Sequence, residues 1–137
     1  MLAEQYALRG DMVKARIYAD STLIGFNTHL DSTPDDWGSQ VGRALALAYL
    51  GRKEAAIHEV DRAMALRPIS KDAFLGPYIQ HQAVRVYILV GEKEKALDLL
   101  EPLLRIPYYL SPAWLQIDPN FAALHGDPRF ERLIAKH

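Results

Sequence analysis

A glycine-centred motif recurs along this sequence at intervals of 41 and 40 residues. Each copy has an apolar residue four positions before the glycine and an alanine five positions after it. The three copies are Tyr6, Gly10 and Ala15; Leu47, Gly51 and Ala56; and Tyr87, Gly91 and Ala96. A fixed period of this length is typical of stacked structural repeats, because one repeat cannot bury its own apolar face. The sequence therefore predicts a repeat protein.

The residues on both sides of each glycine favour helix. In the second copy, residues 44–50 are mostly alanine and leucine, and residues 54–66 place apolar side chains at three- and four-residue steps. A left-handed glycine is expected to end the first helix, and Pro68 prevents the second from continuing. The third copy predicts helices over 79–90 and 93–104. The expected loops between repeats are 28–34 and 67–77.

Three pairs of a capping residue and a proline mark the last third of the chain: Ser111-Pro112, Asp118-Pro119 and Asp127-Pro128. The side-chain oxygen can accept from free backbone N–H groups, and proline suits the first helical position because it has no N–H to leave unpaired. Each pair predicts the start of a short helix. The apolar residues available to cover the third repeat are Trp114, Leu115, Ile117, Phe121, Leu124, Phe130, Leu133 and Ile134.

We therefore expect an all-α fold in which helix hairpins stack as an α-solenoid closed by a helical cap. The expected single domain covers residues 1–137, with repeats at 1–30, 35–68 and 77–106 and capping helices over 111–137. The alternative is an ordinary bundle of three unrelated helix hairpins, although a bundle does not require the shared register.

The motif residues resemble the tetratricopeptide repeat (TPR) family. The middle repeat is the most similar, with Ala44, Leu47, Gly51, Ala56, Ala63 and Pro68. The period here is longer than the family's 34 residues, and the additional residues fall in loops and helix ends. The last third is similar to the closing segment of long bacterial TPR arrays. This resemblance implies that the chain is the C-terminal part of a larger signalling or regulatory protein.

Composition excludes several other classes. The 16 Lys and Arg residues nearly balance 17 Asp and Glu residues, which argues against nucleic-acid binding. There is no cysteine, no apolar run long enough to span a membrane and no signal peptide after Met1. We expect a cytoplasmic protein that does not insert into membranes, or an extracytoplasmic one if it belongs to a membrane-anchored protein.

No residue pattern indicates catalysis, a metal or a cofactor. His58-Glu59 begins like the zinc-protease helix motif, but Arg62 stands where the second histidine is needed. The serine of 38–42 is one position too early for a nucleophile elbow, and no strand is expected before it. We expect no enzyme activity.

The TPR resemblance implies that the first helix of each repeat lines a concave groove. The candidate partner-binding residues on these helices are Val41, Leu45, Tyr49, Tyr78, His81, Gln82 and Arg85. A mixed aromatic, amide and cationic stripe suits recognition of an extended peptide. The alternative is that Tyr78 packs in the fold and that Arg85 is merely solvated.

These observations predict a protein-interaction module that binds a peptide or partner helix. The alternative is an effector-sensing domain that holds a small molecule among Tyr49, Tyr78, His81 and Arg85 and regulates an attached domain. Because the first repeat lacks most of its leading helix, we expect Leu2, Tyr6 and Ile17 to be partly uncovered and a second copy to dock there as a homodimer. The competing interpretation is that residues 2–9 form a short helix that leaves a monomer.

Overall fold

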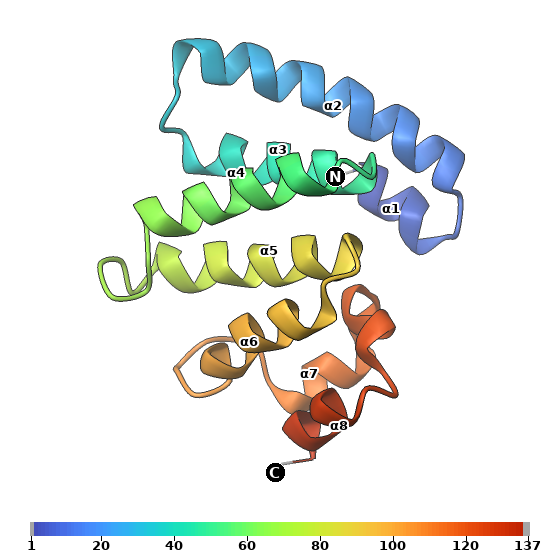
Figure 1. Ribbon diagram of the computed structural model, residues 1–137, viewed down its shortest axis with the longest axis vertical. Coiled ribbons are helices and arrows are strands. Elements are labelled where there is room, and N and C mark those ends of the chain that lie inside the picture. The colour runs from blue at the N-terminus through green and yellow to red at the C-terminus, as the bar shows by residue number, and fades with distance from the viewer. Residues whose placement is uncertain (1, 136–137) are drawn as a thin grey trace. The chain divides into compact units, whose positions relative to one another are not determined.

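The computed structural model describes residues 2–135, and this part of the chain is all-α, with no strand (Figure 1). The chain divides into two compact halves, an N-terminal half (Met1–Leu66) and a C-terminal half (Arg67–His137), which are described separately. Met1 and residues 136–137 of the expected capping segment lie outside the described residues.

The N-terminal half contains the helices α1 (Leu2–Leu8), α2 (Met12–Ser32), α3 (Trp37–Tyr49) and α4 (Lys53–Leu66). The C-terminal half contains α5 (Leu75–Leu89), α6 (Lys93–Leu103), α7 (Pro112–Ile117), the 3-10 helix η1 (Pro119–Leu124) and α8 (Pro128–Ile134). None of the described helices is both long and apolar enough to cross a membrane.

The three repeat glycines end their helices in the same way. Gly10, Gly51 and Gly91 have φ angles of 80°, 75° and 84°, as the sequence predicts. At each turn the glycine N–H donates to the carbonyl three residues earlier, and the next N–H donates to the carbonyl five residues before it. The second carbonyl belongs to the recurring apolar residue, Tyr6, Leu47 or Tyr87, at distances of 2.9, 2.9 and 2.8 Å. This pair of backbone hydrogen bonds is the Schellman motif, and only glycine adopts its left-handed position without strain.

The alanines that follow these turns are all fully buried: Ala15, Ala56 and Ala96. Each lies in the first turn of the second helix of its hairpin, at a position with no room for solvent. This burial agrees with the prediction that a small residue is needed five positions after each glycine.

Packing within the N-terminal half places α2 against both α1 and α3, and α3 against α4. Ala3, Ala19 and Tyr49 form a small apolar cluster. Phe26 of α2 lies directly on Gly42 of α3, where an added Cβ would fall 2.3 Å from the ring. Arg43 of α3 donates to buried Glu59 of α4 at 2.8 Å.

Two of the expected loop boundaries are wrong. Residues 28–32 continue α2 and do not form a loop, because no proline occurs before Pro34 and the Thr28 hydroxyl bonds back to the Ile24 carbonyl. The loop expected over 67–77 ends early. The Asp72 carboxylate accepts hydrogen bonds from the N–H groups of Phe74 and Leu75, so α5 starts before Pro77. Proline is tolerated there because the first turn needs no N–H partner.

The closing segment begins its helices where the proline pairs predict. The Ser111 side chain accepts from Trp114 N, Asp118 from Asn120 N, and Asp127 from Arg129 N and Phe130 N. Within the C-terminal half, η1 packs against α5, and α8 packs against α6 and α7. Four side chains of the closing segment are fully buried: Leu115, Phe121, Leu124 and Phe130.

Two of the residues expected to cover the third repeat do not do so. Trp114 is 43% exposed and Ile117 is 71% exposed. Both lie on α7, where only Leu115 is buried, so this six-residue helix turns one side chain inward. The cap is therefore built mainly by η1 and α8.

Candidate functional site

The structure buries most of the side chains expected to line a groove. Val41, Leu45 and Tyr49 on α3 are buried, as are His81 and Gln82 on α5. Tyr78 is 39% exposed and Arg85 is half-buried. Of the seven candidates, therefore, only these two are more than slightly exposed. Within α5, Gln82 accepts a hydrogen bond from Arg85 at 2.7 Å.

His81 is the centre of an aromatic cluster in the C-terminal half. Its Nδ1 lies 3.1 Å from the Tyr108 hydroxyl and 2.9 Å from the Tyr109 hydroxyl. Phe121 of η1 stacks on the ring with a centroid distance of 5.9 Å and an interplanar angle of 13°. The two tyrosines follow α6, so the cluster joins α5 to both the loop after α6 and the cap.

The cluster is electrically neutral near pH 7. Burial and, to a lesser extent, Arg85 lower the pKa of His81 to about 4, although Asp118 acts in the opposite direction. Burial also raises the pKa of Tyr108 and of Tyr109. When a hydroxyl donates to Nδ1, the ring proton resides on Nε2, which is buried and has no partner among the described residues. A base with so low a pKa is poorly matched to proton transfer at neutral pH, so the cluster is better suited to packing than to catalysis.

Tyr108 and Tyr109 were not identified from the sequence. They lie in an irregular segment between Pro107 and Ser111, where no helical period indicates which side chains face inward. Their contact with His81 spans 27 and 28 residues of chain. The only local signal is the pair of adjacent aromatic residues next to a proline.

The strongest surface feature is on α2, which is apolar on two opposite faces. One face holds Ala15, Ala19, Leu23 and Leu30 and is buried. The opposite face holds Val13, Ile17 and Ile24, which are 70%, 58% and 62% exposed. We call these three residues the α2 apolar face. α2 also carries exposed polar residues, such as Asp20 and Thr28, so these three aliphatic side chains lie on a mixed surface that the chain leaves uncovered.

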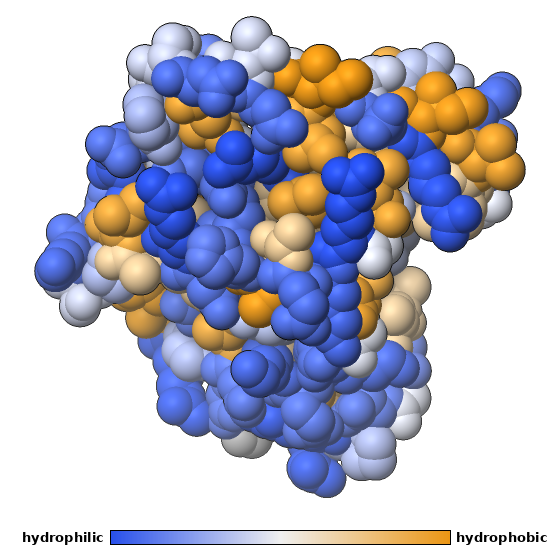
Figure 2. All heavy atoms as spheres, turned by 45° about the horizontal axis from the view of Figure 1, so that its top comes forward, coloured by the Kyte–Doolittle hydropathy of each residue, from blue (hydrophilic) through white to orange (hydrophobic). Residues whose placement is uncertain are grey.

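Other exposed apolar side chains of the first hairpin are Leu2, at the start of α1, and Leu8 and Met12, beside the α1–α2 turn. Figure 2, in which the α2 side is turned toward the viewer, shows apolar atoms near the top centre and at the upper right, with polar atoms between them. Leu2 and Ile17 are exposed and Tyr6 is half-buried, so all three are at least partly uncovered, as the sequence predicts. Tyr6 stacks on Tyr18 with ring centroids 5.1 Å apart. Residues 2–8 form a short helix, as the competing interpretation has it, yet that helix leaves the α2 apolar face uncovered.

The repeat register shows which positions of the other hairpins correspond to this face. Val13 and Ile17 lie three and seven residues after Gly10. The same steps lead to Glu54 and His58 on α4, and to Glu94 and Asp98 on α6. Both pairs are exposed and polar. Among the three second helices, only α2 carries aliphatic residues at these positions.

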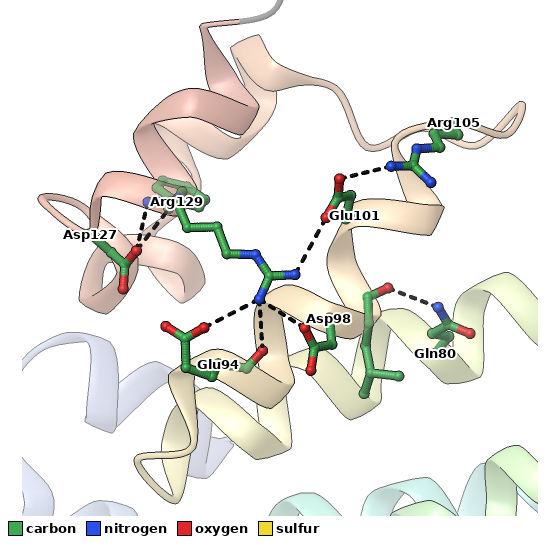
Figure 3. Close-up of polar contacts among 9 residues, drawn as sticks. Gln80, Glu94, Asp98, Glu101, Arg105, Asp127 and Arg129 are labelled. Carbon is green, nitrogen blue, oxygen red and sulfur yellow. Dashed lines mark hydrogen bonds and ion pairs between the residues drawn. The ribbon is translucent and has the colours of Figure 1, made fainter.

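On α6 the corresponding face receives the cap. Arg129 of α8 lies 3.3 Å from Glu94, 2.8 Å from Asp98 and 3.3 Å from Glu101 (Figure 3). The hydrogen bonds that Arg129 donates to these carboxylates, above all to Asp98, raise the pKa of Arg129. The face that carries exposed aliphatic residues on α2 is therefore acidic on α6, where it stays exposed and Arg129 of the cap contacts it.

A hollow of about 410 Å³ lies on another side of α2, lined by Thr22, Gly25, Phe26, His29 and Ser39. At its rim His29 lies 3.3 Å from Asp36, which caps α3. Among residues 2–135, no three His, Cys, Asp or Glu side chains are placed so that they could hold a metal ion. The expectation of a chain without cofactor remains a prediction.

The chain was compared with protein-family models, with curated proteins and with solved structures, and none of the three comparisons finds a match.

Proposed function

We propose that this protein is a non-catalytic, TPR-like protein-interaction module that docks a protein partner on the α2 apolar face. The single observation that carries the proposal is the exposure of Val13, Ile17 and Ile24 on one side of a 21-residue helix. Burying an aliphatic side chain of this size contributes roughly 1.5–3 kcal/mol. A partner that covered all three would gain a substantial hydrophobic contribution.

The TPR-like character is supported by local geometry. Three Schellman turns recur at one spacing, each with a buried alanine five residues after its glycine. Such hairpins bury their faces against neighbouring repeats, so a hairpin with an uncovered apolar side favours association with another surface.

The docking surface is placed on α2 instead of in the predicted groove. A partner could not touch Val41, Leu45, Tyr49, His81 or Gln82 without rearranging the helices that bury them. Val13, Ile17 and Ile24 require no such rearrangement, because their side chains already face solvent.

Site-specific photo-crosslinking tests this proposal. A benzophenone amino acid is placed at Ile17 in the full chain, in the cells that naturally make the protein, and the adducts are identified by mass spectrometry. Phe74, which is 87% exposed and lies outside α2, is the matched control position. We expect a discrete protein adduct from position 17 that Ile24→Asp abolishes. Equal labelling from positions 17 and 74 would contradict the proposal.

A further inference from the structure

We propose that the hollow between α2 and α3 is a binding site for a small organic cation, a primary ammonium ion that carries an apolar body. The hollow lies on a different side of α2 from the α2 apolar face, so the inference goes beyond the proposed function and does not depend on it. Its volume of about 410 Å³ is typical of small-molecule sites, in which a few polar groups orient the ligand. The class of ligand follows from the chemistry of those groups.

The polar side chains at the hollow have already used their hydrogen-bond donors. The Thr22 hydroxyl donates to the Tyr18 carbonyl at 2.7 Å, and the Ser39 hydroxyl donates to the Asp36 carboxylate. His29 Nε2 lies 3.3 Å from the same carboxylate, so in the neutral imidazole the proton resides on Nε2 and Nδ1 is an acceptor. These side chains therefore offer a ligand only lone pairs, and the ligand has to supply the donors.

The negative charge at the rim favours a cation over a neutral donor. The Asp36 side chain is 36% exposed, and hydrogen bonds, chiefly that from Ser39, lower its pKa although burial acts in the opposite direction. This carboxylate is therefore ionised at neutral pH. Asp35 beside it is exposed, and the last turn of α2, which contains His29, adds the negative end of a helix dipole.

Two positive contributions lie on α3, and both are balanced. The N-terminal end of α3 is capped by Asp36, which accepts from Ser39 N at 3.2 Å. Arg43 is paired with buried Glu59 at 2.8 Å. A carboxylate or phosphate ligand would face the Asp36 charge and would find no unused donor among the described side chains that line the hollow. The charges therefore disfavour an anion.

The apolar part of the site is the Phe26 ring and the space beside Gly25. The ring is held against Gly42 of α3, where an added Cβ would fall 2.3 Å from it. A Cβ added at Gly25 would instead enter open space, so the hollow reaches the backbone of α2 there. An apolar body can pack on Phe26, and an ammonium group close to an aromatic ring also gains cation–π attraction.

The first experiment titrates three probes of similar shape into the full chain and follows its amide shifts by NMR. The probes are 2-phenylethylammonium, neutral 2-phenylethanol and anionic 3-phenylpropionate. We expect the ammonium ion to bind at least about tenfold more tightly than the alcohol, because its bonds to the acceptors are charge-assisted. The shifts should centre on residues 22–29 and 36–39, and the anion should cause none. No saturable binding of the ammonium ion, equal binding of the alcohol, or shifts centred elsewhere overturns the inference.

The second experiment repeats the ammonium titration with variants of the hollow. Gly25→Leu fills the space and should abolish binding, whereas α2 should tolerate it because leucine is the better helix former. Gly38→Leu is the matched control, since it also points into open space but does not line the hollow. Circular dichroism confirms that both variants are folded. Unchanged binding by Gly25→Leu, or an equal loss at both glycines, overturns the inference.

The charge is tested in the same way. Asp36→Asn keeps a residue that caps helices well and should weaken binding at least about fivefold through the lost charge. Asp35→Asn, at the neighbouring exposed carboxylate, is the matched control and should change the affinity by less than about twofold. Equal losses at the two positions would mean that the cation is attracted to the surface in general and is not bound in the hollow.

A lysine side chain of a partner protein carries the same ammonium group, and a fourth probe, Nα-acetyl-lysine methylamide, separates this source from a free small molecule. We expect it to bind more weakly than 2-phenylethylammonium, because its stem has no ring to pack on Phe26. Tighter binding of the lysine probe overturns the assignment to a small molecule. These titrations do not involve Ile17, so their failure leaves the proposed function untouched, and the absence of a crosslinked protein at position 17 leaves the hollow untouched.

Discussion

The second helices of the first and third hairpins, α2 and α6, begin in the same way but carry different residues on their outward sides. Both begin two residues after a left-handed glycine and bury an alanine in the first turn. On α6 the outward positions are acidic, and the cap reaches them through Arg129. On α2 the corresponding positions are Val13 and Ile17, which its own chain leaves uncovered. Equivalent positions of the two hairpins therefore differ in character: they are acidic and contacted by the cap on α6, and aliphatic and uncovered on α2.

The largest expected effect is on the cap. Phe130 is fully buried in α8, so Phe130→Ala should lower the free energy of unfolding by about 3–5 kcal/mol through lost burial and a residual cavity. Urea denaturation monitored by circular dichroism measures this change. Trp114→Ala, at a large aromatic residue that is 43% exposed, is the matched control and should cost much less. Equal losses would show that the cap does not depend on the core that η1 and α8 form.

The turns and helix starts could be predicted from the sequence because their chemistry is local. A glycine two residues before a helix, or a serine or aspartate before a proline, determines the backbone within a few residues. The cluster at His81 could not be predicted, since Tyr108 and Tyr109 reach it through an irregular loop. The exposure of Trp114 could not be predicted either, because a six-residue helix is too short to show a period.

The role of the α2 face was only partly predictable. Leu2 and Ile17 were expected to be partly uncovered, because the leading helix of the first repeat was expected to be short. Val13 and Ile24 were not singled out, since α2 is apolar on both sides and its pattern alone does not tell which side faces inward. The expected loop over 28–34 also concealed that α2 continues to Ser32, which lengthens the helix beyond Ile24.

The second prediction concerns the acid sensitivity of the C-terminal half, which contains His81. The folded protein keeps His81 neutral, with a pKa of about 4, whereas the unfolded chain protonates it near 6.5. The contribution of His81 to stability is therefore complete above pH 6.5 and is lost as the pH falls toward 4. Over this range the loss should reach about 3 kcal/mol.

Urea titrations of the wild type and of His81→Gln between pH 7 and pH 4 measure this loss. Because the carboxylates are common to both proteins, the difference between the two curves isolates the histidine. Curves that stay parallel over the whole range would show that burial of this ring does not oppose its protonation.

The third prediction concerns the ionic contact between α8 and α6. Arg129→Met removes the cation that lies among three carboxylates and should cost at most about 1 kcal/mol, because Glu94 and Asp98 are well exposed and solvent screens the pairs. The loss should shrink at high salt. Arg105→Met is the control, since Arg105 contacts Glu101 alone at 2.8 Å from a more exposed position. A similar effect at both sites would mean that Arg129 does not hold the cap in place.

The smallest expected effect is on the stability of the folded monomer when the α2 apolar face is changed. Ile17 touches solvent over more than half of its surface, so Ile17→Asp should alter the free energy of unfolding by no more than about 0.5 kcal/mol at concentrations where the chain is monomeric. Leu23→Asp, on the buried side of the same helix, should instead unfold the N-terminal half. Thermal melts at low micromolar concentration make the comparison. A large loss from Ile17→Asp would mean that the monomer already covers this side chain and that the contrast between α2 and α6 is wrong. A negligible loss of unfolding free energy would show that the fold does not need Ile17. The side chain would then be available to bind a partner.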